Sequence, residues 1–519
     1  MKLGPFALAA LATTAFASLL FTSSGFAQTF PVYGDYSFPG GTGGSGPRGA
    51  LLQARDGTFY GATYAGGANS LGTLFKIAAD AGYVTLHEFS ARDANNANTD
   101  GARPNAALVE GPDGNLYGTA SVGGASGEGT IFRVTPSGQF TTLFSFSNSN
   151  RTGYNALSPL LLGSDGAFYG TTTSGAFGFG TIFRVTTAGA FSVIKEFRTG
   201  EGSNSLGALV EGADGYLYGT TSLSAANNDG TVFKVAKDGS GFAVLHVFSG
   251  TTSGSVNSDG ARPYTGLAFG PDGALYGTTY TGGSGGYGTV FRVTTDGSSF
   301  SVLHSFQYDR DGRYPQGQLV YSRNGTFYGT TTTGGANSRG TVYRITPDGG
   351  QFATVASLDG AGSGDNIPAG VIRGRDGQLY GMAQAGGANN QGVIFEVDLE
   401  TAFFTGENEL ANGVNYLAFP NGNVFGYYSF LVDEHYIFHQ DLGYEYIFDA
   451  NDGQGGVYLY DFKSSTFFYT SPSFGFPYLY DFSLNAVLYY YPEPNNPQRY
   501  NTNGVRYFYN YGTGQIISK

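Results

Sequence analysis

The sequence predicts an all-β protein, a seven-bladed β-propeller followed by a C-terminal aromatic-rich β-meander module. Three observations carry this prediction. The phrase Asp-Gly-x-(Leu/Phe)-Tyr-Gly occurs seven times, once with Asn in place of Asp. Each copy is followed by a Gly-rich stretch and a second phrase, Gly-(Thr/Val)-x-(Phe/Tyr)-x-(Val/Ile). The chain also has 85 Gly and 16% aromatic residues, a composition that suits many short strands joined by tight turns.

Each repeat resolves into four expected strands. In the fifth copy these are residues 266–269, 275–279, 289–293 and 300–306. Asp-Gly pairs between the strands favour tight hairpins, because both turn positions tolerate a positive φ. The phrase begins at Asp56, Asp113, Asp165, Asp214, Asp272, Asn324 and Asp376. Four-stranded antiparallel units at roughly 40–55 residues per repeat are typical of propeller blades.

The number of outermost strands predicts how the ring closes. Six repeats are followed by such a strand, whereas the seventh ends near Asp398 without a clear copy. A similar segment, residues 32–38, precedes the first repeat, and Phe38 stands nine residues before Pro47, as Phe306 does before Pro315. We therefore expect the N-terminal segment to complete the seventh blade and remove its exposed edge. Residues 402–405 are the alternative source of that strand.

The repeat resembles the GloVer tandem-repeat family of bacterial proteins. The residues that carry the resemblance are PDGALYGTT at 271–279, GTVFRV at 288–293 and LHSF at 303–306. The resemblance covers about residues 30–398. It implies an exported bacterial propeller joined to varied C-terminal modules, and it implies no activity.

The two ends of the chain differ from the repeats. Residues 1–27 have the pattern of a secretory signal peptide, with Lys2, an apolar stretch, and a cleavage site after Ala27. A membrane anchor is the alternative. We assign residues 28–398 to the propeller and 399–519 to the C-terminal module. Tyr and Phe make up 32 of the 119 residues from 401 to 519, and the phrase YLYDF at 458–462 returns at 478–482.

Composition excludes several classes of function. The 39 acidic residues outnumber the 26 basic ones, giving a net charge of −13, which disfavours nucleic-acid binding. The chain has no Cys, so disulfides and thiolate metal sites are absent. No stretch beyond the signal peptide is apolar and long enough to be read as a membrane span.

The long loops of the repeats indicate where a ligand would bind. The Asp-Gly hairpins lie on one face of a propeller, and the Gly-rich loops and the linkers between blades lie on the other. We call the second the loop-rich face and expect binding there, with Tyr64 and Tyr280 as candidate ligand-binding residues.

Three linkers carry the phrase (Asn/Asp)-x-Asp-Gly, whose alternating oxygens resemble the opening of a calcium loop. An ordinary Asx-turn is the alternative, and no Glu occupies the twelfth loop position. The candidate metal ligands are Asn98, Asp100, Asn257, Asp259, Asp309 and Asp311.

The histidines and acids do not form a recognisable catalytic set. His87, His246 and His304 recur at one place in three outermost strands, which favours a structural role over metal binding. His435 and His439 are four residues apart, but the residues between them read as a strand rather than a helix. Most Asp residues are explained by turns, and no nucleophile with a matching base stands out.

We therefore predict an exported, non-enzymatic binding or scaffold protein of the bacterial envelope or exterior. The alternative is a carbohydrate-binding or carbohydrate-active propeller that uses the loop-rich face. The expected partner is an extracellular polysaccharide or a cell-surface protein, and no cofactor is predicted apart from the calcium hypothesis.

Overall fold

The computed structural model describes residues 32–399, except 79–81, 224–227, 253–254, 309–310, 323–324 and 376. Beyond residue 399 it describes only the backbone of the strands of one sheet. The predicted signal peptide, residues 1–27, and the predicted mature N-terminus, Gln28, lie outside the described residues.

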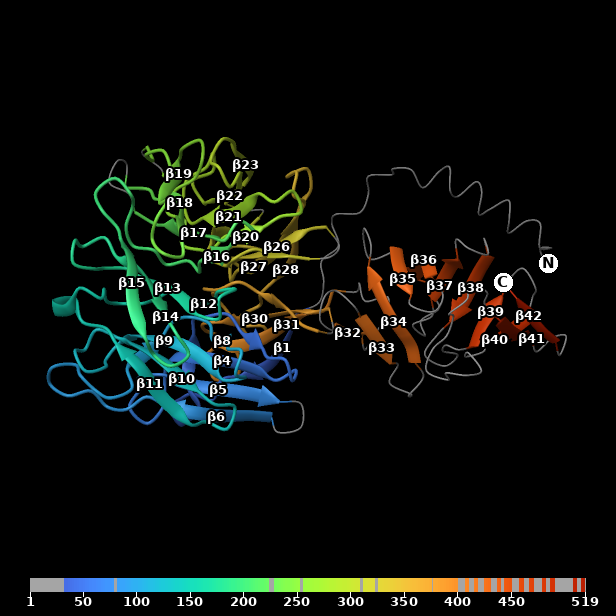
Figure 1. The fold of residues 1–519 in the computed structure, drawn as a ribbon, viewed down its shortest axis with the longest axis horizontal. Helices are drawn as coiled ribbons and strands as arrows, with labels where there is room; N and C mark the ends of the chain where they lie inside the picture. The colour runs from blue at the N-terminus through green and yellow to red at the C-terminus, as the bar shows by residue number, and fades with distance from the viewer. Residues whose placement is uncertain are drawn as a thin grey trace.

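Seven antiparallel sheets, each of four or five strands, form the ring that the repeats predict (Figure 1). Each blade is built, from the centre outwards, from an inner strand, two long central strands and an outer strand. The first central strands are β4 (Phe59–Ala65), β9 (Leu116–Val122), β13 (Phe168–Thr172), β17 (Tyr216–Thr221), β21 (Leu275–Thr279), β26 (Phe327–Thr333) and β30 (Leu379–Ala383). The second are β5 (Thr73–Ala78), β10 (Thr130–Val134), β14 (Thr181–Val185), β18 (Thr231–Ala236), β22 (Thr289–Val293), β27 (Thr341–Ile345) and β31 (Val393–Val397).

The outer strands confirm the predicted ring closure. They are β6 (Gly82–Glu88), β11 (Phe140–Ser145), β15 (Phe191–Glu196), β19 (Ala243–Val247), β23 (Phe300–Ser305), β28 (Phe352–Ser357) and β1 (Val32–Ser37). Six of them follow the central strands of their own blade, whereas β1 pairs antiparallel with β31, with Val32 opposite Val397 and Ser37 opposite Val393. The alternative segment, residues 402–405, lies outside the described residues.

The recurring phrase is explained by contacts inside each blade. In the second blade the Asp113 carboxylate accepts hydrogen bonds from the Asn115 backbone N–H and from the Tyr117 hydroxyl, the latter at 2.7 Å. Burial, together with the Asp113 carboxylate, raises the pKa of Tyr117 to about 12. A Cβ on Gly118 would lie 2.7 Å from Cζ of Phe132, so the Gly leaves room for the aromatic ring of the next strand.

The hydrophobic core lies between neighbouring blades. One cluster joins Tyr60, Leu74 and Phe89 of the first blade to Phe132 and Val134 of the second, all nearly inaccessible to solvent. Equivalent clusters follow around the ring. Because each cluster needs both blades, closing the ring adds the cluster between the seventh blade and the first, which contains Phe38, Phe75 and Ile394.

The sixth blade departs from this core at one residue. Tyr343 takes the place that Phe occupies in the other six blades, and its buried hydroxyl has no hydrogen-bond partner among the described residues. Removing an unsatisfied buried hydroxyl removes its desolvation penalty. We expect Tyr343→Phe to raise the free energy of unfolding by about 1 kcal/mol in urea denaturation. The reverse change at the equivalent position, Phe291→Tyr, should lower it, and a destabilised Tyr343→Phe would contradict this explanation.

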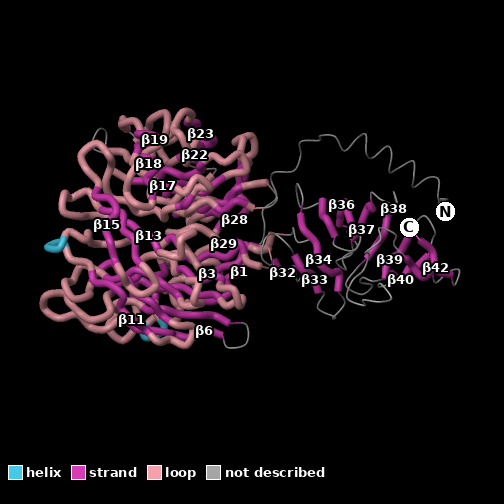
Figure 2. The backbone as a smooth tube through the Cα atoms, viewed as in Figure 1, coloured by secondary structure: helices cyan, strands magenta, loops and turns pink. Residues whose placement is uncertain are grey.

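The strands beyond residue 399 form a separate 11-stranded sheet in which neighbours along the chain pair in order. They are β32 (Glu407–Glu409), β33 (Asn415–Ala418), β34 (Val424–Phe430), β35 (Tyr436–His439), β36 (Gly443–Asp449), β37 (Val457–Asp461), β38 (Thr466–Thr470), β39 (Tyr478–Asp481), β40 (Ala486–Tyr490), β41 (Tyr507–Asn510) and β42 (Gln515–Ser518). In the described residues the helical segments are two 3-10 turns, η1 (Gly41–Gly43) and η2 (Asn148–Asn150), and no helix there is long and apolar enough to cross a membrane (Figure 2).

Candidate functional site: a cavity at the centre of the ring

The inner strand of each blade differs from the prediction because it is interrupted. In the first blade, β2 (Ser45–Pro47) pairs with the end of β4, and β3 (Leu52–Gln53) pairs with its beginning. The residues between β2 and β3 do not pair with β4, and they lie at the centre of the ring. The remaining inner pieces are β7 (Ala102–Pro104), β8 (Val109–Glu110), β12 (Leu161–Leu162), β16 (Val210–Glu211), β20 (Ala268–Phe269), β24 (Arg313–Pro315), β25 (Val320–Tyr321) and β29 (Ile372–Arg373). Where the first piece is not a strand, a single bridge replaces it, as between Ala261 and Thr281.

A left-handed backbone residue precedes the interruption in every blade. These residues have φ between 56° and 63°, and they are Gly46, Arg103, Asn155, Asn204, Arg262, Tyr314 and Asn366. The N–H of Arg103 donates to the Leu71 carbonyl in the Gly-rich loop of the preceding blade, at 2.7 Å. Gly and Asn tolerate this conformation best, so the bulky Arg103, Arg262 and Tyr314 are held there against their local preference.

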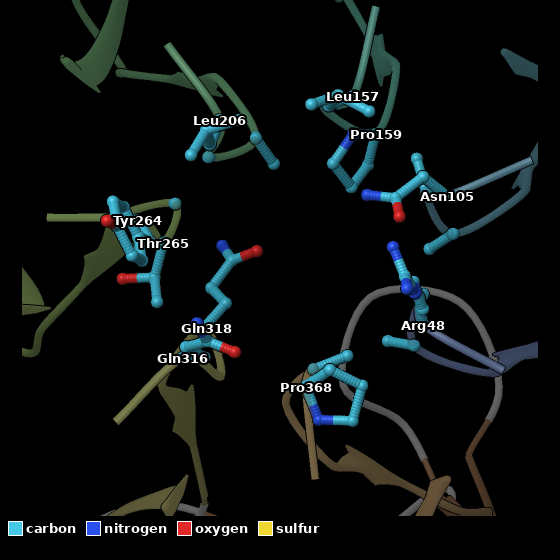
Figure 3. Close-up of a pocket in the computed structure, with 18 of the residues that line it drawn as sticks. Arg48, Asn105, Leu157, Pro159, Leu206, Tyr264, Thr265, Gln316, Gln318 and Pro368 are labelled. Carbon is cyan, nitrogen blue, oxygen red and sulfur yellow. The ribbon is translucent and has the colours of Figure 1, made fainter. Parts of the chain in front are cut away.

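The second residue after each left-handed position lines the central cavity. One side chain from each blade forms this set, which we call the mouth ring: Arg48, Asn105, Leu157, Leu206, Tyr264, Gln316 and Pro368. The cavity has a volume of about 540 Å³. In Figure 3, Arg48 and Asn105 lie on one side, Gln316 and Gln318 on the opposite side, and Leu157 and Leu206 between them.

Small residues fix the geometry of the mouth ring. A Cβ on Gly207 would lie 2.3 Å from the backbone carbonyl of Thr265 in the next blade, and one on Gly49 would lie 2.5 Å from the backbone of Ala106. The Thr220 hydroxyl also donates to the Thr265 carbonyl, at 2.8 Å. The interrupted segments therefore pack backbone to backbone, which makes the cavity a preformed feature of the closed ring.

Tyr64 lies in a cationic corner of the cavity. The Arg48 guanidinium carbon is 3.6 Å from the centre of the Tyr64 ring, and that of Arg103 is 5.4 Å from it. Arg103 also donates a hydrogen bond to the Tyr64 hydroxyl at 3.3 Å. The predicted residue Tyr64 thus lines the cavity, and sequence reasoning missed both arginines that flank it.

Tyr280 occupies the same strand position in the fifth blade, but it stands behind the cavity wall. Its ring lies 4.8 Å from that of Tyr264, which lines the cavity, and stacks on Tyr314 at 4.9 Å. Burial raises the pKa of Tyr280, and the neighbouring phenols Tyr264 and Tyr314 act in the same direction. The tyrosine row continues through Tyr287 to Tyr308, whose side chain is 51% exposed.

A family model describes most of the propeller. The model of the Gloeobacter/Verrucomicrobia repeat matches residues 94–258 and 251–418, which together cover more than half of the 519 residues. The chain belongs to the Gloeobacter/Verrucomicrobia repeat family. The resemblance noted from the repeat phrases is therefore confirmed.

Comparisons beyond the family are more distant. No protein with a curated description matches the sequence. An inactive virginiamycin B lyase variant from Staphylococcus aureus has 16% identity and a TM-score of 0.49, with 71% of this chain and 99% of that chain covered. The BP39L lectin from Burkholderia pseudomallei has 11% identity and a TM-score of 0.47, with coverage of 72% and 97%. The extracellular domain of the one-component system BT4673 from B. thetaiotaomicron has 10% identity and a TM-score of 0.47, and this chain spans only 58% of its length.

In this Gloeobacter/Verrucomicrobia repeat protein, the histidines and the linker carboxylates that the sequence singled out separately form pairs. His87 Nε2 donates to Asp100 Oδ2 at 3.0 Å, and the Ser90 hydroxyl and N–H donate to the same carboxylate. Burial alone would raise the pKa of Asp100, but the hydrogen bonds from His87 and Ser90 outweigh it and lower the pKa. His87 also stacks on Phe140 of the next blade, with ring centres 3.9 Å apart.

The same pairing recurs twice in the Gloeobacter/Verrucomicrobia repeats. His246 pairs with Asp259 and His304 with Asp311, each at 3.0 Å. The sequence analysis singled out both the His and the Asp residues but did not predict that they form hydrogen bonds with each other. The available signal was that the recurring His and the (Asn/Asp)-x-Asp-Gly phrase occur in the same three repeats.

The remaining candidate metal ligands of this family member are also held by the protein. Asn98 Oδ1 accepts from the N–H groups of Gly101 and Gly124, and Asn257 makes the equivalent contacts. A calcium ion at these residues would have to displace those donors. Within the described part of the chain no three His, Cys, Asp or Glu side chains cluster as metal ligands. Asp309, His435 and the side chain of His439 lie outside the described residues.

Proposed function

We propose that this protein is an exported, non-enzymatic binding protein of the bacterial envelope or exterior, and that the central cavity takes its ligand. The observation that carries the proposal is the chemistry of the mouth ring. The seven blades repeat their turn, strand and core residues, yet the mouth ring offers Arg, Asn, Leu, Leu, Tyr, Gln and Pro. A purely structural position in a symmetric repeat needs one residue type, whereas a ligand without sevenfold symmetry needs different ones.

The dimensions and the lining of the cavity support binding of a small molecule. Its volume of about 540 Å³ falls in the range of roughly 300–1,000 Å³ typical of such sites. Leu157, Pro159 and Leu206 provide apolar surface, and the amides and arginines provide convergent polar groups. The backbone packing that preforms the ring reduces the entropy lost when a ligand binds.

The polar groups of the cavity suit recognition better than acid–base chemistry. General acid–base catalysis is usually performed by His, Asp or Glu side chains. Among the described residues that line the cavity, none is of these three types, and the phenols of Tyr64 and Tyr264 are the groups there that could act as a general acid or base. Guanidinium, amide and phenol groups orient a ligand through hydrogen bonds, which supports a binding role.

Carbohydrate binding is the second candidate, and the tyrosine row favours it. Tyr264 lines the cavity with Tyr280 and Tyr314 stacked behind it. Tyr rings present apolar faces to the C–H faces of sugars and a hydroxyl to their oxygens. The amides of the mouth ring would then contact the sugar hydroxyls.

A bulky side chain in the mouth ring tests whether the ligand binds in the cavity. Leu206→Trp places a larger side chain in the mouth ring, and we expect it to weaken binding of any cavity ligand at least tenfold, about 1.4 kcal/mol. The wild type and the variant are compared on a glycan array and in a thermal-shift screen of small molecules. Val247→Trp, at an exposed residue on the outer strand of the same blade, is the matched control.

The pattern of hits separates the candidates. Glycans that bind the wild type and Val247→Trp but not Leu206→Trp would support carbohydrate binding. Only non-sugar hits with the same pattern would support binding of another ligand class. Ligands that bind all three proteins equally would show that the cavity is not the site.

A further inference from the structure

Two arginines share one corner of a cavity in an otherwise acidic protein. The whole chain has a net charge of −13, yet Arg48 and Arg103 both lie against the ring of Tyr64, and no carboxylate of the described residues lines the cavity. Positive charge that converges in a concave site raises the local concentration of anions. The cavity is thus a local exception to the charge of the chain.

Neither guanidinium is neutralised within the described part of the protein. No ion pair to Arg48 or Arg103 is formed there, although other arginines of the ring have partners, such as Arg339 with Asp365. Nε of Arg48 is buried and has no hydrogen-bond partner among the described residues. Two like charges without a counter-charge at the edge of a cavity favour the binding of an anion there.

The side chains around the two arginines limit which kind of ligand could supply the anionic group. Figure 3 shows Arg48 pointing toward the amide of Asn105, and Gln316 and Gln318 on the opposite side of the cavity. Gln318 is held by a hydrogen bond from its Nε2 to the Leu267 carbonyl at 2.8 Å. Amides on both sides and apolar Leu157 and Leu206 between them suit a molecule with an anionic group, several hydroxyls and an apolar face.

We propose that the cavity binds a sugar acid of the uronate class, with its carboxylate held by Arg48 and Arg103. Arg binds carboxylates through paired N–H donors, and neither arginine of this corner has a carboxylate partner among the described residues. The hydroxyls lie against the amides of Asn105, Gln316 and Gln318, and the apolar face of the sugar ring lies against the leucines. This inference rests on the proposed binding function of the cavity.

The test compares sugars that differ only at C6, where a carboxylate replaces the hydroxymethyl group. Isothermal titration measures binding of the methyl glycosides of glucuronate, galacturonate and mannuronate and of their neutral parent hexoses. At least one uronide should bind, and its neutral parent should bind at least tenfold more weakly. Benzoate, which has the carboxylate without the hydroxyls, and inorganic phosphate, which has the charge without the sugar, should both bind more weakly than that uronide.

Variants locate the anion. Arg48→Gln and Arg103→Gln should each weaken the uronide about tenfold and weaken the neutral hexose by a clearly smaller factor. Arg262→Gln is the matched control, because Arg262 has the same left-handed backbone as Arg103 but does not line the cavity. It should change uronide affinity less than twofold. Higher salt should weaken the uronide and not the hexose.

The outcomes separate this inference from the proposed function. A hexose that binds as tightly as its uronide, or benzoate or phosphate that binds more tightly, would overturn the sugar-acid inference. If no uronide binds while another compound does, and Leu206→Trp blocks that compound, the inference fails and the binding function stands. If Leu206→Trp weakens no ligand, the binding function fails as well.

Discussion

Removal of residues 28–38 is expected to lower the free energy of unfolding of the propeller by several kcal/mol, because it opens the ring. Strand β1 provides the outer edge of the blade that contains β30 and β31. Phe38 directly after it is fully buried, with its ring centre 5.3 Å from that of Phe75 in the first blade. The deletion removes contacts within the seventh blade and contacts between the last blade and the first.

A single substitution gives a sharper form of this prediction. Phe38→Ala should lower the free energy of unfolding by about 3–5 kcal/mol, the usual range for a buried Phe. Phe146→Ala is the matched control, since Phe146 follows the outer strand of a blade whose strands are consecutive in the chain, and it is also fully buried. Urea denaturation followed by tyrosine fluorescence measures both, as the chain has no Trp.

If β1 closes the ring, a separate peptide with the sequence of β1 should be able to replace it. A synthetic peptide of residues 28–38 should restore part of the stability of the truncated chain, and the stabilisation should rise with the logarithm of the peptide concentration above its Kd. A truncated protein that unfolds at the wild-type urea concentration would contradict closure by β1. Phe38→Ala with a small effect beside a large effect of Phe146→Ala would contradict it too.

Loss of the Asp259 carboxylate is the second change with a large expected effect. It accepts hydrogen bonds from His246 Nε2 and from the N–H and hydroxyl of Ser249. Asp259→Ala leaves these donors without their acceptor at a partly buried site, so we expect a loss of about 2–3 kcal/mol at pH 7. Asp259→Asn keeps an acceptor oxygen and should lose less.

The effect of Asp259→Ala should depend on pH with a definite sign. Burial acts to raise the pKa of Asp259, but the hydrogen bonds from His246 and Ser249 outweigh it, and the folded pKa lies below that of an ordinary Asp carboxyl group. A carboxylate with a lowered folded pKa stabilises fully above its unfolded pKa, and this stabilisation is lost as the pH falls through the folded value. The difference between wild type and variant should therefore be constant above about pH 5 and shrink below about pH 4. A difference that grows in acid would show that another interaction dominates.

Calcium provides an independent check of the same linkers. Because Asp100, Asp259 and Asn98 already accept hydrogen bonds from the protein, we expect a chelator to leave the melting temperature unchanged. A fall on chelation that excess calcium reverses would instead establish the calcium sites that the linker phrase suggests.

Sequence reasoning reached the fold because the repeats supply their own internal comparison. Each phrase could be aligned with six others, and the missing outer strand was found by counting and by the equal spacing from Phe38 to Pro47 and from Phe306 to Pro315. The structure pairs that segment with β31 as expected. The interruption of the inner strands was missed, because a few residues leaving a ladder produce no change in hydrophobic alternation.

The repeat phrases did not reveal the cavity, because its lining residues lie outside them. Arg48, Asn105 and Leu157 follow no motif, and each resembles an ordinary linker residue when its repeat is considered alone. When the repeats are aligned on the left-handed residue, these three residues occupy the same position of the repeat. The side chain at that position differs in polarity and charge from blade to blade. Tyr64 was predicted from its place on the loop-rich face, whereas its contacts with two arginines depend on the neighbouring linkers and could not be predicted from its own repeat.

A crystal structure of the full chain grown with the methyl uronide that binds most tightly tests the central claim most directly. We predict that the sugar occupies the cavity inside the mouth ring, with its carboxylate within hydrogen-bond distance of Arg48 or Arg103 and its hydroxyls facing Asn105 or Gln318. A uronide bound elsewhere on the protein, with the space between Arg48 and Gln318 filled by solvent alone, would contradict the assignment of this cavity as the ligand site.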